Sequence, residues 1–189
     1  MGRGYHGAVA RVLIDGPPAS GKSTIATHTA ELLRERGETV FGFTTSEVRR
    51  GGRRTGFTVA GIASGLERVL AVRGGEGPQV GAYGVDVEAF EEIALIEIEN
   101  GLELDATLVV DEVGKMELAS SRFAELVGAI FDAPRWLICV QRPPHPSIET
   151  LIDRAAPKRI GLPRPDRAEL PQVVVAWLLE EDVARYSSR

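Results

Sequence analysis

The amino-acid sequence predicts an α/β fold: a three-layer sandwich with a mostly parallel central sheet, plus an antiparallel hairpin insertion. Short apolar, β-branched segments alternate with helix-like segments along most of the 189 residues. This alternation is typical of a parallel sheet that helices cover on both faces. One region, about residues 39–85, departs from it, because several strand-like segments follow one another there. The length favours a single domain that spans residues 1–189.

The first elements are a strand, a glycine-rich loop and a helix. Residues 8–15 (AVARVLID) are apolar and β-branched, which predicts a buried strand. A cluster of glycines, prolines and small residues at 16–21 ends this strand. Residues 22–36 form a helix-like segment, and Gly37 stands where a glycine commonly follows the last helical residue.

The insertion is predicted to be a hairpin with further short strands. Strand-like residues 40–43 and 57–60 lie on either side of Gly51-Gly52, a pair that suits a tight hairpin turn. Residues 66–72 and 79–83 add two short apolar segments, so we expect the insertion to be antiparallel.

Helices and strands alternate again in the second half. Asp86 is suited to cap a helix that runs through Glu99 and ends at Gly101. Residues 108–110 predict a second buried strand, which runs into Asp111-Glu112. The remaining elements are expected to be a helix from Ser120 or Ser121 to about Phe131, a buried strand at 136–140, a short helix at 147–155, a short strand at 159–162 and a last helix from Pro171 to about Ala184.

The amino-acid composition argues against several classes of protein. Hydrophobic residues (43%) and charged residues (26%) occur in proportions that exclude general disorder. The net charge of −5 argues against a protein that mainly coats nucleic acid, so a nucleic-acid partner is not indicated, though it stays open. The longest apolar run, residues 173–179, is far shorter than the ~20 residues of a membrane-spanning helix. We therefore expect a cytoplasmic protein with no membrane partner, and the oligomeric state is left open.

The single cysteine, Cys139, excludes an internal disulfide, and its apolar surroundings predict a core residue.

The glycine-rich loop carries the strongest functional motif. Gly16-Pro17-Pro18-Ala19-Ser20-Gly21-Lys22-Ser23 matches G-x-x-x-x-G-K-[ST] at every fixed position. Small residues let successive backbone N–H groups surround a phosphate, and the following helix directs its positive end there. Lys22 is then expected to reach the β- and γ-phosphates, and the Ser23 hydroxyl to bind Mg²⁺.

An acidic pair follows the second buried strand. Downstream of a phosphate loop, an aspartate at such a strand end usually contacts the hydration shell of Mg²⁺, so Asp111 is predicted to hold the metal partly through water. Glu112 is expected at the carboxyl edge of the sheet, where ligands bind in α/β folds. Its carboxylate is suited to polarise a water for attack on the γ-phosphate. Taken alone, such a pair is also a common polar end of a strand.

Lysine is rare in this chain, because only Lys22, Lys115 and Lys158 occur among 22 basic residues. Lys115 follows Gly114, close to the acidic pair. It either offsets negative charge at the γ-phosphate or is a solvated loop residue. Spacing alone does not decide between these two interpretations.

These motifs occur in an order that resembles a known family. The segments are Gly16-Pro17-Pro18-Ala19-Ser20-Gly21-Lys22-Ser23, residues 42–49 (GFTTSEVR), 52–57 (GRRTGF), 80–83 (VGAY) with Phe90-Glu91, and 110–118 (VDEVGKMEL). Together they resemble the nucleoside-triphosphatase family whose human member is called cancer-related nucleoside-triphosphatase, with homologues in thermophilic bacteria and archaea. The similarity extends from about Arg11 to Leu179.

The resemblance implies a P-loop NTPase fold and Mg²⁺-dependent hydrolysis of nucleoside triphosphates (ATP, GTP, CTP and UTP) to the diphosphate and phosphate, with loose base preference. It implies that Lys22, Glu112 and Lys115 are catalytic, with Glu112 activating water, and that Ser23 and Asp111 hold Mg²⁺. The residues expected to bind nucleotide are Gly16, Pro17, Pro18, Ala19, Ser20, Gly21, Lys22, Ser23, Thr24, Asp111, Glu112, Gly114 and Lys115.

The chain departs from the family pattern at three places. Thr44 stands where many members have an aromatic residue. Gln141-Arg142-Pro143-Pro144 replaces a common Thr-Ile-Pro, and Asp166-Arg167 replaces an Asn-Arg pair. If these late loops frame the base, the base preference does not transfer from the family.

Four arginines, Arg49, Arg50, Arg53 and Arg54, lie in the predicted hairpin. One of them is a candidate arginine finger, in cis or across a dimer. Alternatively, the cluster contacts RNA or DNA phosphates, or it is a solvated turn. Within the family pattern Arg49 and Arg53 are the better candidates, but neither is assigned a catalytic role.

Two other functions remain open at this point. The first is a small-molecule or nucleotide kinase, because Gly21-Lys22-Ser23-Thr24 also resembles the opening of nucleotide kinases. A kinase must keep water from the γ-phosphate, however, and Glu112 beside Asp111 suits water activation instead. The second is a nucleotide-gated binding module in which slow hydrolysis resets a switch.

Overall fold

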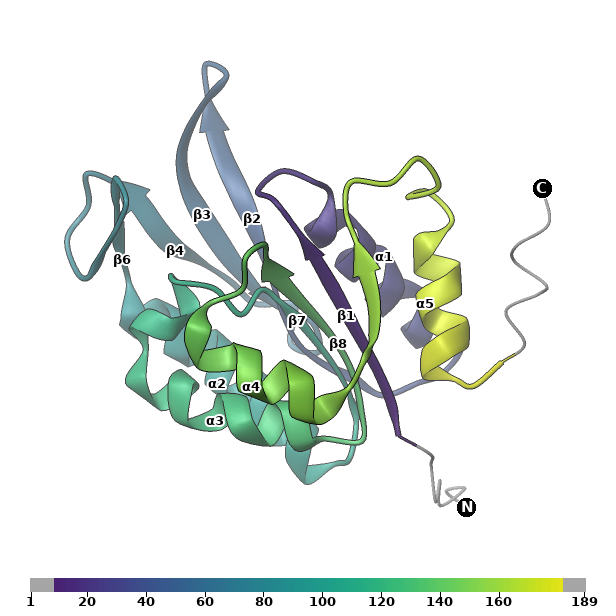
Figure 1. Ribbon diagram of the computed structural model, residues 1–189. Coiled ribbons are helices and arrows are strands. Elements are labelled where there is room, and N and C mark those ends of the chain that lie inside the picture. The colour runs from purple at the N-terminus through teal and green to yellow at the C-terminus, as the bar shows by residue number, and fades with distance from the viewer. Residues whose placement is uncertain (1–8, 182–189) are drawn as a thin grey trace.

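The computed structural model describes residues 9–181. Its centre is a nine-stranded sheet in the order β5-β6-β4-β3-β2-β7-β8-β1-β9 (Figure 1). The strands are β1 (Ala10–Gly16), β2 (Val40–Arg50), β3 (Arg53–Gly61), β4 (Glu67–Arg73), β5 (Gln79–Val80), β6 (Tyr83–Val85), β7 (Thr107–Asp111), β8 (Arg135–Gln141) and β9 (Lys158–Gly161). Four neighbouring pairs in this order are parallel: β2-β7, β7-β8, β8-β1 and β1-β9. The other four are antiparallel: β2-β3, β3-β4, β4-β6 and β6-β5. The predicted mixed α/β sheet with a hairpin insertion is thereby confirmed.

Helices cover both faces of the sheet. They are α1 (Lys22–Glu35), α2 (Val87–Glu103), α3 (Ser121–Asp132), α4 (Pro146–Ala155) and α5 (Leu170–Leu178), with a short 3₁₀ turn, η1 (Glu117–Ala119). In Figure 1, α1 and α5 lie on one face, and α2, α3 and α4 lie on the other. Each face has its own apolar core, so the three-layer sandwich is also confirmed.

Strands β1, β7 and β8 form the buried centre of the sheet. Val12, Leu13 and Ile14 of β1 are fully buried, as are Leu108, Val109 and Val110 of β7. Apolar side chains on both faces are expected of parallel strands between two helical layers. Because β1, β7 and β8 are parallel, their carboxyl ends lie at one edge of the sheet. Both sequence motifs follow strands that end there.

The β2–β3 hairpin projects beyond this edge (Figure 1). Its turn is Gly51-Gly52, with φ angles of 56° and 75°, so both residues adopt the left-handed conformation that a tight hairpin turn requires. The hairpin turn predicted from the sequence is confirmed. We refer to β3, β4, β5 and β6 together as the antiparallel extension.

Glu97 of α2 ties the antiparallel extension to the rest of the fold. Its carboxylate is 3% exposed and accepts hydrogen bonds from the backbone N–H groups of Gly42 (3.2 Å), Ala63 (3.1 Å) and Ser64 (2.7 Å). One buried carboxylate therefore holds both the start of β2 and the turn after β3.

Three predicted helix boundaries are confirmed. The Asp86 side chain accepts from the Ala89 N–H at 3.0 Å and caps α2. The Ser120 hydroxyl accepts from the Phe123 N–H at 3.0 Å and caps α3. Gly37 has a φ angle of 82° directly after α1, which fits the glycine that often follows a helix.

Two predicted helix ends are wrong. Helix α2 passes through Gly101 to Glu103. A Cβ at Gly101 would lie 2.5 Å from Leu108 Cδ2 and 2.8 Å from Phe41 Cβ. Gly101 therefore allows the helix to pack against the sheet, and it does not end the helix. Helix α5 ends at Leu178 instead of about Ala184, and residues 182–184 lie outside the described residues.

Cys139 lies fully buried in β8, as expected of a core residue. Among the helices of residues 9–181, none combines the length and the hydropathy needed to cross a membrane.

Candidate active site

The phosphate loop connects β1 to α1 at the carboxyl edge of the sheet. Ala19 and Gly21 adopt left-handed φ angles of 60° and 97°, which turn the backbone tightly into the helix. Gly16 has no space for a side chain, because a Cβ there would lie 2.7 Å from Ser20 Oγ. No acidic residue occupies the first turn of α1. The unpaired N–H groups of this helix start are thus available to an anion.

Lys22 lies across this loop. Its Nζ donates to the carbonyl oxygens of Gly16 and Pro17, both at 3.2 Å, and forms an ion pair with Glu112 Oε2 at 3.3 Å. The side chain is only 6% exposed. These contacts hold the ammonium group against the loop whose backbone N–H groups are expected to bind phosphate.

Asp111, at the end of β7, has a buried carboxylate with unusual surroundings. Neither of its oxygens has a hydrogen-bond partner among residues 9–181. Burial, together with the negative charge of Glu112, raises the pKa of Asp111 to about 6, although the nearby Ser23 hydroxyl acts in the opposite direction. An unpartnered buried carboxylate is costly unless another group satisfies it.

These surroundings fit a magnesium ion. Mg²⁺ prefers oxygen ligands, keeps several waters and typically takes only one or two protein groups together with phosphate oxygens. The Ser23 hydroxyl and the Asp111 carboxylate are groups of this kind. No cluster of three or more His, Cys, Asp or Glu side chains with metal-site geometry occurs in the described part of the chain.

Glu112 is held between two partners. Its Oε2 faces Lys22, and its Oε1 accepts a hydrogen bond of 2.7 Å from the Gln141 side-chain amide. Gln141 is the last residue of β8, the strand between β1 and β7. In the sequence, Gln141 stands out only as a departure from the family pattern. The sequence could have indicated this contact, because Gln141 is a polar residue at the end of a predicted strand that is parallel to the strand before Glu112.

Glu117 is a second group that the sequence analysis did not assign to the site. It is 4% exposed, and its carboxyl accepts the Gly114 N–H at 3.1 Å. Burial raises the pKa of Glu117 to about 8, and the charges of Glu112 and Asp111 add to this effect. A neutral carboxyl group therefore supports the loop that carries Glu112 and Lys115.

A cavity of about 580 Å³ lies over these groups. The phosphate loop from Pro18 to Thr24 forms one side of it, together with Glu112, Lys115 and Gln141. The other lining residues come mainly from the hairpin and the loop before β6: Thr45, Ser46, Glu47, Arg54, Phe57, Val80, Gly81, Tyr83 and Met116. Of the residues predicted to bind nucleotide, Gly16, Pro17, Asp111 and Gly114 lie outside the lining.

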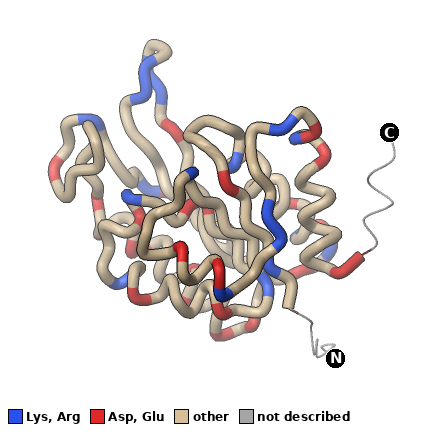
Figure 2. Tube along the Cα trace, in the orientation of Figure 1, with Lys and Arg blue, Asp and Glu red and all other residues tan. Residues whose placement is uncertain are grey.

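The four hairpin arginines differ in their exposure and in whether they line the cavity. Arg49, Arg50 and Arg53 are exposed near the tip, where Figure 2 shows basic residues together. Arg54 is half-buried and is the one of the four that lines the cavity. Arg49 and Arg53, the two that the family pattern favours, do not line the cavity, and Arg53 and Arg54 differ because neighbouring residues of a strand face opposite sides.

The late loops are held by their own ion pairs. Asp15, at the end of β1, is paired with Arg142 and Arg159, and Asp166 with Arg164 at 2.6 Å.

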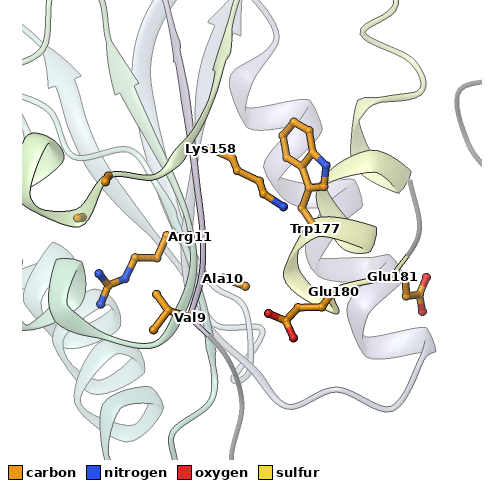
Figure 3. A pocket seen from close by; sticks show the side chains of 9 residues that line it. Val9, Ala10, Arg11, Lys158, Trp177, Glu180 and Glu181 are labelled. Atoms are coloured by element: carbon orange, nitrogen blue, oxygen red, sulfur yellow. The ribbon is translucent and has the colours of Figure 1, made fainter. Parts of the chain in front are cut away.

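A second hollow, of about 380 Å³, lies near the amino end of β1 (Figure 3). Lys158 extends toward Trp177, with Nζ 5.3 Å from the ring centroid, while Glu180 and Glu181 lie nearby. Neither the phosphate loop nor the acidic pair contributes to this lining. The cavity at the carboxyl edge is therefore the candidate active site.

Comparison with known proteins identifies the family of this chain. The chain matches the family model described as NTPase over residues 11–175. It is 36% identical to nucleoside-triphosphatase THEP1 of Methanopyrus kandleri, over 89% of this chain and 95% of the relative. The crystal structure of THEP1 from Aquifex aeolicus is similar, with a TM-score of 0.76 and 27% identity over 88% of this chain and 98% of that one. The solution structure of a human cancer-related nucleoside triphosphatase has a TM-score of 0.74 and 33% identity, over 92% and 100%. The chain belongs to the NTPase family that includes these nucleoside-triphosphatases.

Proposed function

We propose that this protein hydrolyses nucleoside 5′-triphosphates to the diphosphate and phosphate with Mg²⁺ as cofactor. The main support is the position of Glu112, which lies beside the phosphate loop, 3.3 Å from Lys22, and next to Asp111, whose buried carboxylate accepts no hydrogen bond from residues 9–181. A carboxylate in this place is suited to accept a proton from water. The names of the relatives agree with this activity.

Substrate binding begins at Lys22. Its ammonium group pairs with Glu112 and donates to the Gly16 and Pro17 carbonyls. The β- and γ-phosphates attract this charge more strongly, so Lys22 turns to them and releases Glu112 Oε2. Gln141 continues to hold Oε1. Nucleotide binding thus converts Glu112 from an ion-pair partner into an available base.

Hydrolysis then requires one water in line with the γ-phosphate. Glu112 removes a proton from that water while the water oxygen bonds to the γ-phosphorus. The bond between the γ-phosphorus and the oxygen that bridges to the β-phosphate then breaks. Lys22 and the N–H groups of the phosphate loop stabilise the charge on the phosphate oxygens. Ser23 and Asp111, the latter partly through water, hold Mg²⁺, which neutralises charge on the phosphates when it is bound.

We further propose a loose base preference, with ATP, GTP, CTP and UTP all accepted. Arg142 and Asp166, in the loops where the chain departs from the family, are paired with Asp15 and Arg164. Side chains engaged in this way are less available to distinguish one base from another by hydrogen bonding.

Phosphate release tests this function directly. The wild-type protein is incubated with each of the four nucleotides, with and without Mg²⁺, and free phosphate and diphosphate are measured. We expect equal amounts of both products, dependence on the metal and similar rates for several bases. Tight nucleotide binding without phosphate release would contradict the proposal. Diphosphate formed only when a phosphate acceptor is added would indicate a kinase instead.

A further inference from the structure

The residues that line the cavity outside the phosphate loop include a positive charge that the proposed mechanism does not use. It belongs to Arg54, the second residue of β3. Its side chain is 37% exposed, against 54% for Arg49.

The guanidinium group of Arg54 is held by several contacts. Nη1 donates to Glu47 Oε1 at 2.7 Å, and Nε donates to the Tyr83 hydroxyl at 3.0 Å. The group also lies over two aromatic rings, 5.2 Å from the Phe57 centroid and 5.6 Å from that of Tyr83. No hydrogen bond joins Nη2 to any residue of the range 9–181. These contacts orient the guanidinium group and use two of its five N–H donors, which leaves one on Nη1 and two on Nη2 for a ligand.

The charge of Arg54 is not fully neutralised. Glu47 is shared, because its Oε2 pairs with Arg49 at 2.6 Å while its Oε1 pairs with Arg54. The three side chains therefore carry two positive charges and one negative charge. Arg49 uses its donors locally, on Glu47 and on the Gly52 carbonyl. The remaining charge faces the cavity through Arg54.

We propose that Arg54 is a catalytic residue that contacts the terminal phosphate of the bound nucleoside triphosphate from within the same chain. This inference rests on the proposed hydrolysis. During in-line transfer, negative charge spreads over the γ-phosphoryl oxygens and the bridging oxygen, and a fixed guanidinium group stabilises it. Glu47, Phe57 and Tyr83 are positioning residues in this arrangement. The β2–β3 hairpin thus supplies an arginine finger in cis.

The test compares two neighbouring arginines. Arg54→Ala and Arg53→Ala remove the same charge from the same strand, but Arg53 is exposed and does not line the cavity. Steady-state hydrolysis of Mg·ATP gives kcat, and ADP with aluminium fluoride serves as the probe of the transferring phosphoryl group. We expect Arg54→Ala to lower kcat ~10²–10³-fold, to change the Kd for ADP less than about 3-fold and to abolish the tight complex with aluminium fluoride. Arg53→Ala should match the wild type in all three.

Two further variants separate catalysis from folding. Arg54→Lys keeps the charge without the planar fork, and we expect partial recovery of kcat. Tyr83→Phe removes one hydrogen bond that orients Arg54, and we expect a smaller decrease in kcat than for Arg54→Ala. If Arg54→Ala does not fold, these two variants decide the question.

The inference would be overturned by a kcat of Arg54→Ala within about 3-fold of the wild type, or by an equal loss in Arg53→Ala. A Glu112→Gln variant measured in parallel keeps the two claims apart. If Glu112→Gln loses turnover and Arg54→Ala retains it, only the role of Arg54 fails. If the wild type itself releases no phosphate, the proposed function fails first.

Discussion

The parallel and antiparallel parts of the sheet present polar groups to the cavity in different ways. In the parallel part, β1 and β7 are buried along their length, and Lys22 and Glu112 lie just beyond the strand ends. In the antiparallel extension, one face of β4 is open, with Val69 50% and Val72 47% exposed, and Arg54 enters the cavity from the side of a strand. Phosphate binding and water activation are thus assigned to the parallel part. The extension contributes other lining residues of the same cavity, Arg54 among them.

The strongest test of this division is Lys22→Ala. The ammonium group meets phosphate in both the ground state and the transition state, so its loss should weaken ATP binding and turnover together. We expect kcat/KM to decrease by about 10³-fold or more, and calorimetric titration with a non-hydrolysable ATP analogue should show much weaker binding. Unchanged affinity would mean that the loop does not bind phosphate, and the parallel part would lose its assigned role.

The buried carboxyl of Glu117 makes stability depend on pH. In the folded protein its pKa is about 8, whereas an unfolded glutamate titrates near 4.3. Between these values the folded state keeps a proton that the unfolded state releases, so the free energy of unfolding should decrease as pH rises, by up to about 1.4 kcal/mol per pH unit. Above pH 8 this dependence ends. Because Asp111 has a pKa of about 6, the window from about pH 6.5 to 8 reports mainly on Glu117.

Urea unfolding of Glu117→Gln measures this effect, since the amide keeps an acceptor for the Gly114 N–H and does not ionise. The variant should show a flatter pH dependence than the wild type in that window. Equal slopes for the two proteins would show that Glu117 does not stay protonated.

Glu97→Ala tests the link between the two parts. The change leaves the N–H groups of Gly42, Ala63 and Ser64 without their buried acceptor, so we expect the free energy of unfolding to decrease by about 3 kcal/mol. Since the turn after β3 is loosened, hydrogen exchange should increase at Ala63 and Ser64 and stay unchanged in β1. Equal increases in hydrogen exchange at Ala63 and Ser64 and in β1 would show that Glu97 does not stabilise the antiparallel extension separately from the rest of the sheet.

The smallest expected effect concerns Gln141. Gln141→Leu removes the donor that orients Glu112, and we expect kcat to decrease about 10-fold, equivalent to about 1.4 kcal/mol, with little change in the Kd for ATP. Gln141→Thr, which introduces the residue that relatives often have after this strand, keeps a hydroxyl donor and should retain more activity. Equal rates for both variants and the wild type would show that Lys22 and the backbone orient Glu112 without help.

The same contrast explains what could be predicted from the sequence. The phosphate loop and Asp111-Glu112 follow directly after buried strands, so a short motif and the strand pattern were enough to place them at one edge. The sequence pattern favoured Arg49 and Arg53 over Arg54, because it does not show which face of the hairpin turns to the cavity. Gln141 and Glu117 were not assigned either, since their contacts join segments that only the strand order and loop path bring together. Gly101 was misread because its close neighbours, Phe41 and Leu108, belong to other elements.

The central claim is that Glu112 activates water, and one comparison tests it most directly. Phosphate release from Mg·ATP is measured for the wild type, for Glu112→Gln and for Glu31→Gln, which makes the same charge change at an exposed site on α1 outside the cavity lining. We expect a ~10²–10⁴-fold lower kcat for Glu112→Gln, with ATP affinity within about 3-fold of the wild type, and no change for Glu31→Gln. Wild-type turnover in Glu112→Gln would contradict the account.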